Sequence, residues 1–136
     1  MRLYRPVGIA ELELIAATQW RAFPPRLFHQ PIFYPVLNFQ YARLIAENWN
    51  TKDPNSGFAG FVTEFDVDDN FAARYEIRTV GSREARELWV PAEELAEFNS
   101  QLNGPIMVIG RYYGELFSGA VDAQTQLPTT VVAPSE

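Results

Sequence analysis

The chain has 136 residues, of which 47% are hydrophobic and 14% aromatic, so it is long enough to bury the core of one domain. It contains no cysteine, which excludes disulfides, thiolate catalysis and cysteine zinc sites. Its formal net charge of −6 is opposite in sign to that of a general polyanion binder, so nucleic acid is disfavoured as a non-specific partner.

The distribution of apolar residues argues against a membrane protein. No apolar run approaches the ~18 residues that are needed to span a bilayer. Residues 1–8 lack the continuous apolar segment of a signal peptide. We therefore expect a cytoplasmic protein without membrane contact, and the absence of cysteine is compatible with that location.

The N-terminal half of the chain predicts two helices and two short strands. A strand is expected at residues 3–7, and apolar residues at helical spacing predict a helix from residue 9 to about residue 18. Residues 20–35 contain four prolines, which exclude a helix and leave room for a short strand at residues 32–34. Asn38 is suited to cap the next helix, whose apolar face extends to Trp49.

Strands predominate in the second half. A loop at residues 50–57 precedes a strand at residues 58–67, whose alternating pattern predicts one buried and one exposed face. The remaining elements are a helical turn, two strands, a helix and a last strand, expected at residues 68–73, 75–80, 88–90, 92–101 and 105–113. Beyond Gly114 the apolar density falls.

This order of elements predicts the fold class. Helices come mainly from the N-terminal half and strands from the C-terminal half, which favours an α+β fold with a split, mostly antiparallel sheet over a doubly wound parallel one. Residues 1–114 are expected to form a single domain. Residues 115–136 are expected to form a partly disordered C-terminal tail.

Several kinds of catalytic site lack the residues that they need. His29 is the only histidine, so the sequence supports neither a metal site nor a serine hydrolase triad, and we expect no metal. No G-x-S-x-G motif and no phosphate-binding glycine loop occur. The acidic pairs at residues 68–69 and 93–94 fit the first turns of helices, where the helix dipole favours negative charge.

A glutamate, Glu87, stands directly before the apolar strand expected at residues 88–90. Carboxylates are uncommon beside apolar cores unless a partner pairs with them or a reaction uses them. Arg5 ends the first strand and Tyr34 lies in the second, so the three side chains converge in one cleft if these strands are neighbours. An arginine, an aromatic ring and a carboxylate suit cleavage of the glycosidic bond of a nucleotide.

The spacing of these three residues also fits simpler roles. Glu87 would then mark the point at which a strand meets water, Arg5 would be a surface ion-pair partner, and Tyr34 would belong to the core. The residues by themselves leave both interpretations open.

Three segments, LYRPVG, PIFYPVLNFQYARLIAENW and RELWVPAEEL, occur in an order that resembles the ADP-ribosyltransferase-like fold. The resemblance is specifically to a family of short bacterial proteins with ADP-ribosylation/crystallin-type names. In that fold an arginine or histidine ends the first strand, and Arg5 matches this position. A strand that carries serine or tyrosine then leads into a helix, and the segment with Tyr34 matches this pattern. A glutamate then precedes an apolar strand that ends in proline, as Glu87 does in ELWVP. The similarity spans about residues 2–113.

The resemblance implies an NAD-dependent mono-ADP-ribosyltransferase-like protein, with NAD as co-substrate and an acceptor that the sequence does not identify. Arg5 would anchor the NAD pyrophosphate or ribose, Tyr34 would stack on nicotinamide, and Glu87 would stabilise the ribose cation. These three are the implied catalytic residues. The implied cofactor-binding residues are Arg5, Tyr4, Phe33, Tyr34 and Tyr41.

One departure from the family pattern concerns the acceptor. Transferases of this superfamily that modify arginine or asparagine commonly carry Glu or Gln two residues before the catalytic glutamate, and here that position is Ala85. The alternative function is therefore a catalytically degenerate nucleotide-binding or protein-interaction module, for which Trp20, Phe23 and Phe28 are candidate exposed aromatic residues. A structural domain with no small-molecule site is a third interpretation.

Overall fold

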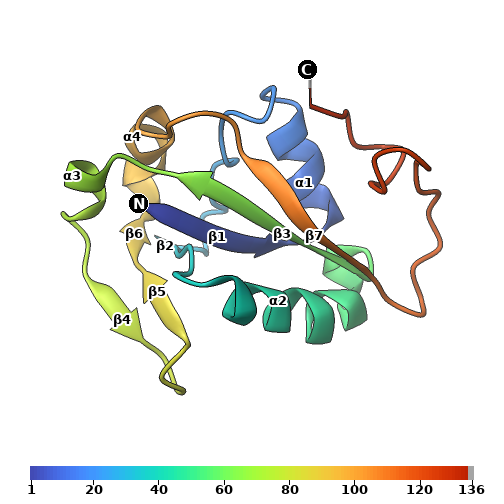
Figure 1. The fold of residues 1–136 in the computed structure, drawn as a ribbon, viewed down its shortest axis with the longest axis horizontal. Coiled ribbons are helices and arrows are strands. Elements are labelled where there is room, and N and C mark those ends of the chain that lie inside the picture. Colours follow the sequence, from blue (N-terminus) through green and yellow to red (C-terminus); the bar gives the residue numbers. More distant parts are fainter. Residues whose placement is uncertain (135–136) are drawn as a thin grey trace.

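Three antiparallel strands form the centre of the fold, which a computed structural model describes for residues 1–134 (Figure 1). β3 (Ala59–Asp66) lies between β1 (Arg2–Val7) and β7 (Met107–Tyr113). With the four α-helices and two further strand pairs, all antiparallel, this sheet confirms an α+β fold.

Two helices cover opposite faces of this sheet. α1 (Ile9–Ala16) packs against the main core, whereas α2 (Phe39–Asn48) packs with Val62 of β3 in a second apolar cluster. β3 is consequently buried on both sides, and the predicted half-buried strand at residues 58–67 is wrong in this respect. The alternating pattern did not show that α2 buries the second face of β3, because α2 packs there through small side chains and against Gly60.

Asn38 caps the N-terminus of α2, as predicted. The Asn38 side chain accepts a hydrogen bond from the backbone N–H of Tyr41 at 2.8 Å, which satisfies one of the free donors of the first turn. On the side of α2 that faces the sheet, Ala42 and Ala46 are buried, and the backbone of Ala46 approaches Gly60 so closely that a Cβ there would overlap the Ala46 carbonyl oxygen.

Replacing Gly60 by alanine should therefore destabilise the protein. The added methyl group meets backbone of α2, which can yield only if the helix moves, and overpacking of this kind costs about 1–3 kcal/mol. Gly119→Ala is the matched control, because its Cβ would meet only the ring of Phe117, at 3.0 Å, and a side chain can shift. Urea unfolding of both variants measures the difference, and equal midpoints would contradict the close approach of α2.

Two small strand pairs lie beside β1. β2 (Ile32–Phe33) pairs with β6 (Val90–Pro91), and β4 (Ile77–Thr79) pairs with β5 (Arg86–Leu88). The predicted strand at residues 88–90 is therefore divided at Trp89 between β5 and β6. Glu87 lies inside β5 and not in front of a strand, which corrects the position expected from the sequence.

One residue, Val36, joins β1 to these smaller pairs. Its backbone exchanges two hydrogen bonds with Tyr4, of 2.9 and 2.7 Å, and it forms an antiparallel bridge to Glu87 on its other side. Residues 34–37 thus run between β1 and β5.

The remaining helices are short. Asp68 caps α3 (Asp69–Ala72) by accepting a hydrogen bond from the N–H of Phe71, which agrees with the predicted helical turn. The predicted helix at residues 92–101 begins as a 3-10 helix (Ala92–Glu94) and continues as α4 (Leu95–Ser100). The loop at residues 50–57 contains two further 3-10 helices, Asn50–Lys52 and Pro54–Ser56.

Aromatic rings fill the core between the sheet, α1 and α4. Phe98 of α4 is fully buried and contacts three other phenylalanine rings at centroid distances of 5.4, 6.3 and 6.2 Å, those of Phe33, Phe65 and Phe71. Trp20 and Phe23 also belong to this core, so they are not exposed aromatic residues, whereas Phe28 is fully exposed.

Residues 115–134 form neither helix nor strand in the described part of the chain, yet they pack on the core. Leu127 and Val131 are buried, and the indole N–H of Trp20 donates a hydrogen bond to the carbonyl oxygen of Val132 at 3.0 Å. The last two residues of the predicted tail, 135–136, lie outside the described residues.

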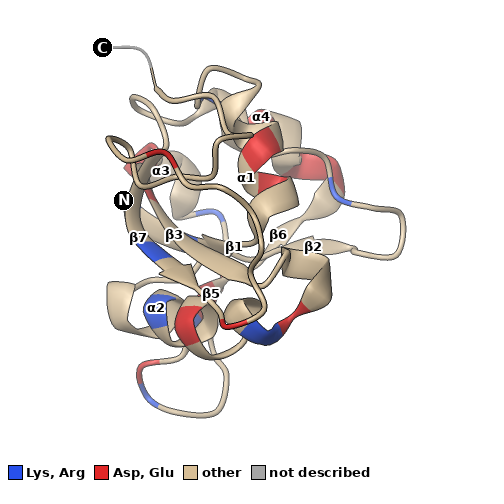
Figure 2. Cartoon of the chain, turned by 90° about the vertical axis from the view of Figure 1, so that its right-hand side faces the viewer, with Lys and Arg blue, Asp and Glu red and all other residues tan. Residues whose placement is uncertain are grey.

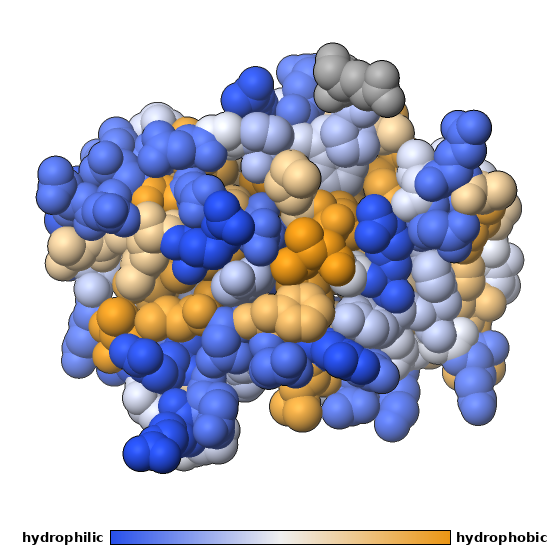
Figure 3. Space-filling model, viewed as in Figure 1, coloured by the Kyte–Doolittle hydropathy of each residue, from blue (hydrophilic) through white to orange (hydrophobic). Residues whose placement is uncertain are grey.

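The surface carries mixed charge and scattered apolar groups. Acidic residues lie on several helices and strands (Figure 2). On the face seen in Figure 1, apolar side chains gather near the centre among hydrophilic ones (Figure 3), and β7 exposes Met107 and Ile109. None of the helices formed by residues 1–134 has the length and apolar character needed to cross a membrane.

Candidate functional site

A cleft of about 890 Å³ opens at the edge of β1 that faces away from β3. Its walls come from α1, from residues 24–30, from α2 and the 3-10 helices that follow it, and from Tyr34, Val36 and Glu87. A volume of this size is sufficient for a dinucleotide or a smaller nucleotide. The residues that line the cleft include Arg5, Tyr34, Tyr41 and Glu87.

The strand pairing explains why the cleft forms there. β2 precedes Val36 in the chain and pairs with β6 instead of β1, so the edge of β1 at Arg5 to Val7 has no strand beside it among residues 1–134. The side chains that pair across the strands here all face α2, namely those of Tyr4, Val36 and Glu87. Arg5 is the next residue after Tyr4, so its side chain points to the opposite face, toward α1. Arg5 and Glu87 reach the same cleft because the strands separate at this point.

Arg5 is held by an ion pair. Its Nε and one terminal nitrogen donate to the two oxygens of Glu11 at 2.7 and 3.0 Å, in a bidentate arrangement. Its guanidinium also lies over the ring of Phe33, 4.8 Å from the centroid. Burial alone would lower the pKa of Arg5, but the charge and hydrogen bonds of Glu11 outweigh burial and raise it. Arg5 is thus a permanently charged, fixed group.

Glu87 is fixed by two neutral donors. The hydroxyl of Tyr41 donates to Oε2 and the indole N–H of Trp89 donates to Oε1, each at 3.0 Å. Burial, together with the hydrogen bond to Glu87 and its charge, raises the pKa of Tyr41 to about 12, so Tyr41 stays protonated and continues to donate at neutral pH. Neutral groups therefore orient both carboxylate oxygens, and among residues 1–134 no cation lies within ion-pair distance of them.

Two guanidinium groups lie near the ring of Tyr34. Those of Arg5 and Arg26 are each 5.9 Å from the centroid of its ring, and the side chain is 42% exposed. A ring that is exposed on a cleft and bordered by cations can stack against a flat ligand.

The exposure of these side chains differs from that expected for the simpler roles, although Arg5 does form an ion pair, with Glu11. Glu87 and Arg5 are each 7% exposed, so Glu87 does not mark a contact with water and Arg5 is not a surface ion-pair partner. Tyr34, at 42% exposure, is not a core residue.

Two of the expected cofactor-binding residues lie outside the cleft. Phe33 is a core residue, 1% exposed, and supports Arg5 from below the surface. Tyr4 packs edge-on against Phe39, with ring centroids 6.4 Å apart, on the α2 side of the sheet. Tyr41 does line the cleft, where it reaches Glu87.

Three residues important to the cleft were missed in the sequence. Glu11 could have been noticed as an acidic residue in the first turn of the helix that follows Arg5. Trp89 lies two residues from Glu87, a spacing that puts both side chains on the same side of an extended segment. Arg26 lies among prolines in a loop, where no periodic pattern indicates which residues point into a site.

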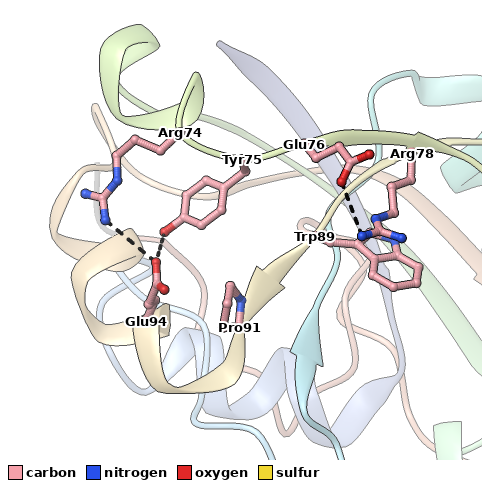
Figure 4. Close-up of a pocket in the computed structure, with 7 residues that line it drawn as sticks. All are labelled: Arg74, Tyr75, Glu76, Arg78, Trp89, Pro91 and Glu94. Carbon is pink, nitrogen blue, oxygen red and sulfur yellow. Dashed lines mark hydrogen bonds and ion pairs between the residues drawn. The ribbon is translucent and has the colours of Figure 1, made fainter.

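A second, smaller pocket of about 360 Å³ has Trp89 at one end (Figure 4). The guanidinium of Arg78 covers the Trp89 ring at 4.3 Å and pairs with Glu76 at 3.2 Å. At the other end of the pocket, Glu94 accepts a hydrogen bond from the Tyr75 hydroxyl at 2.6 Å and pairs with Arg74 at 3.7 Å. Its charged groups are thus paired with one another, and Arg78 supports the indole that orients Glu87.

The cleft combines an oriented carboxylate, an exposed aromatic ring and two arginines, which suits a nucleotide whose ribose develops positive charge. Within residues 1–134, no cluster of histidine, aspartate and glutamate side chains is arranged to hold a metal ion.

Comparisons of the chain with models of protein families, with curated proteins and with solved structures found no match.

Proposed function

We propose that this protein is an NAD-dependent mono-ADP-ribosyltransferase-like enzyme, which transfers ADP-ribose from NAD to an acceptor. The observation that carries the proposal is the placement of Glu87 in one cleft with Arg5 and Tyr34, with both of its oxygens held by neutral donors. The separation of β1 from β2 at Val36 supports a split sheet of the ADP-ribosyltransferase-like kind.

In this reaction the bond between nicotinamide nitrogen and ribose C1′ breaks, and its electron pair leaves with the nicotinamide. The ribose becomes an oxocarbenium ion, which the carboxylate of Glu87 stabilises. An acceptor nucleophile then attacks C1′ and loses a proton. Tyr41 and Trp89 hold the carboxylate in place during these steps, because both donors remain protonated at neutral pH.

The acceptor stays unnamed in this proposal. Ala85, two residues before Glu87, is buried and has no group that could orient an acceptor, while the Glu84 side chain is exposed. The backbone carbonyl of Glu84 accepts a hydrogen bond from the side-chain amide of Asn38 at 2.6 Å, so this turn is attached to the start of α2.

Replacing Glu87 by glutamine tests the proposal. We expect the rate of nicotinamide release from NAD to fall by about 10²–10³-fold, as when one electrostatic contact to a transition state is removed. The glutamine keeps the shape of the side chain and one acceptor oxygen, so the fold should persist. Chromatographic measurement of nicotinamide, with water and with a lysate as sources of acceptor, gives the rates.

Glu84→Gln is the matched control, because Glu84 is exposed and lies outside the cleft lining. It should release nicotinamide at the wild-type rate. Equal rates for Glu87→Gln and wild type, or no release and no NAD binding by the wild-type protein, would contradict the transferase.

A catalytically degenerate nucleotide-binding module is the second candidate. It is favoured by Ala85, which leaves the position two residues before Glu87 without a group that could orient an acceptor. Titration calorimetry separates the two candidates, since NAD binding without nicotinamide release indicates the module.

A further inference from the structure

We propose that Arg26 is the residue that binds the diphosphate of the nucleotide, and that Arg5 is a positioning residue for the cleft wall. This assignment rests on the proposed binding of NAD or a related nucleotide in the cleft. It differs from the role expected for Arg5 in the sequence, and it names a residue that lies in the loop at residues 24–30.

The contacts of Arg5 leave it little capacity for a ligand. Its Nε and one terminal nitrogen are used by Glu11, and the side chain is 7% exposed. The pair as a whole is neutral, so it attracts an anion only weakly. Arg5 instead supports Phe33 and Tyr34, over whose rings its guanidinium lies at 4.8 and 5.9 Å.

Arg26 has the opposite properties. It is partly exposed on the cleft, and among residues 1–134 no carboxylate lies within ion-pair distance of it. Its Nε donates to the carbonyl oxygen of Ile32 at 3.1 Å, which fixes the plane of the guanidinium. Within the described part of the chain, its two terminal nitrogens make no hydrogen bond to protein, so both can donate to a phosphate in the bidentate manner typical of arginine.

The surroundings of Arg26 favour an anion. Partial burial and the positive charge of Arg5 both lower the pKa of Arg26, and the opposing effect of the Glu11 charge is smaller, so the charged form is only partly compensated in the cleft. A phosphate beside Arg26 would supply that compensation. Because the ring of Tyr34 lies 5.9 Å from the Arg26 guanidinium, one ligand could contact both the cation and the ring.

Binding measurements with two ligands test the assignment. ADP-ribose carries the diphosphate, whereas nicotinamide riboside carries no phosphate. By calorimetry, we expect Arg26→Ala to weaken ADP-ribose binding by about 10–100-fold, the usual effect of losing charged hydrogen bonds, and to leave nicotinamide riboside binding unchanged. Arg26→Lys should show an intermediate loss, because it keeps the charge without the bidentate geometry.

Arg21→Ala is the matched control, since Arg21 is an exposed arginine nearby that does not line the cleft. It should bind both ligands as the wild type does. Circular dichroism melting of each variant checks folding, and Arg26→Lys provides the test if Arg26→Ala does not fold. Wild-type affinity of both Arg26 variants for ADP-ribose, equal losses for the two ligands, or no ADP-ribose binding by the wild-type protein would overturn the assignment.

These outcomes separate the assignment from the proposed reaction. If ADP-ribose binds in an Arg26-dependent manner and no nicotinamide is released from NAD, the transferase is wrong and the diphosphate site stands. If nicotinamide is released and the Arg26 variants bind ADP-ribose like the wild type, the transferase stands and the diphosphate site is wrong.

Discussion

Replacing Phe98 by alanine is expected to lower the free energy of unfolding by about 3–5 kcal/mol, the usual cost of removing a buried phenylalanine side chain. Phe98 is fully buried and joins the rings of Phe33, Phe65 and Phe71, so its removal leaves a cavity at the centre of the core. For a chain of this length the loss corresponds to a decrease in Tm of about 10–20 °C, which calorimetry can measure.

The control for this change is Phe28→Ala. Phe28 is fully exposed, so the same substitution removes no buried contact with the core and should change the free energy of unfolding by less than about 0.5 kcal/mol. A similar loss of stability in both variants would contradict the position of α4 over the sheet.

The second large effect is expected at the ion pair beside the cleft. Glu11→Gln leaves the guanidinium of Arg5 charged and buried without a counter-ion, which costs about 3–5 kcal/mol in other proteins. Chemical denaturation at neutral pH measures the loss. Glu13→Gln, on the same helix and without an ion pair among the described residues, should change stability little.

A double variant distinguishes the unpaired charge from simple loss of packing. In Arg5→Met with Glu11→Leu, both charges are replaced by apolar side chains of similar size, so most of the stability lost in Glu11→Gln should return. If the double variant is less stable than Glu11→Gln, the penalty comes from the shape of the site and not from the charge of Arg5.

Local signals in the sequence predicted the elements that they control. Asn38 caps α2 and Asp68 caps α3 as expected, because a cap depends only on residues within one turn. Arg5, Tyr34 and Glu87 also line one cleft, as expected if their strands were neighbours, although Arg5 and Glu87 lie within β1 and β5 and not at strand ends.

Features that depend on distant residues could not be predicted. The burial of Trp20 requires the carbonyl of Val132, which lies at the other end of the chain, and the double cover of β3 requires the approach of Ala46 to Gly60. The position of Arg26 on the cleft is likewise set by tertiary packing, so the sequence did not distinguish this partly exposed arginine from Arg5, which is buried and paired with Glu11.

The prolines of the loop at residues 24–30 have a thermodynamic consequence for Arg26. Pro24 and Pro25 directly precede Arg26 and Pro31 closes the segment, so the loop has fewer backbone conformations to lose on binding than a loop without proline. These prolines therefore reduce the entropy cost of binding. They also help to keep the guanidinium of Arg26 at the cleft before an anion binds.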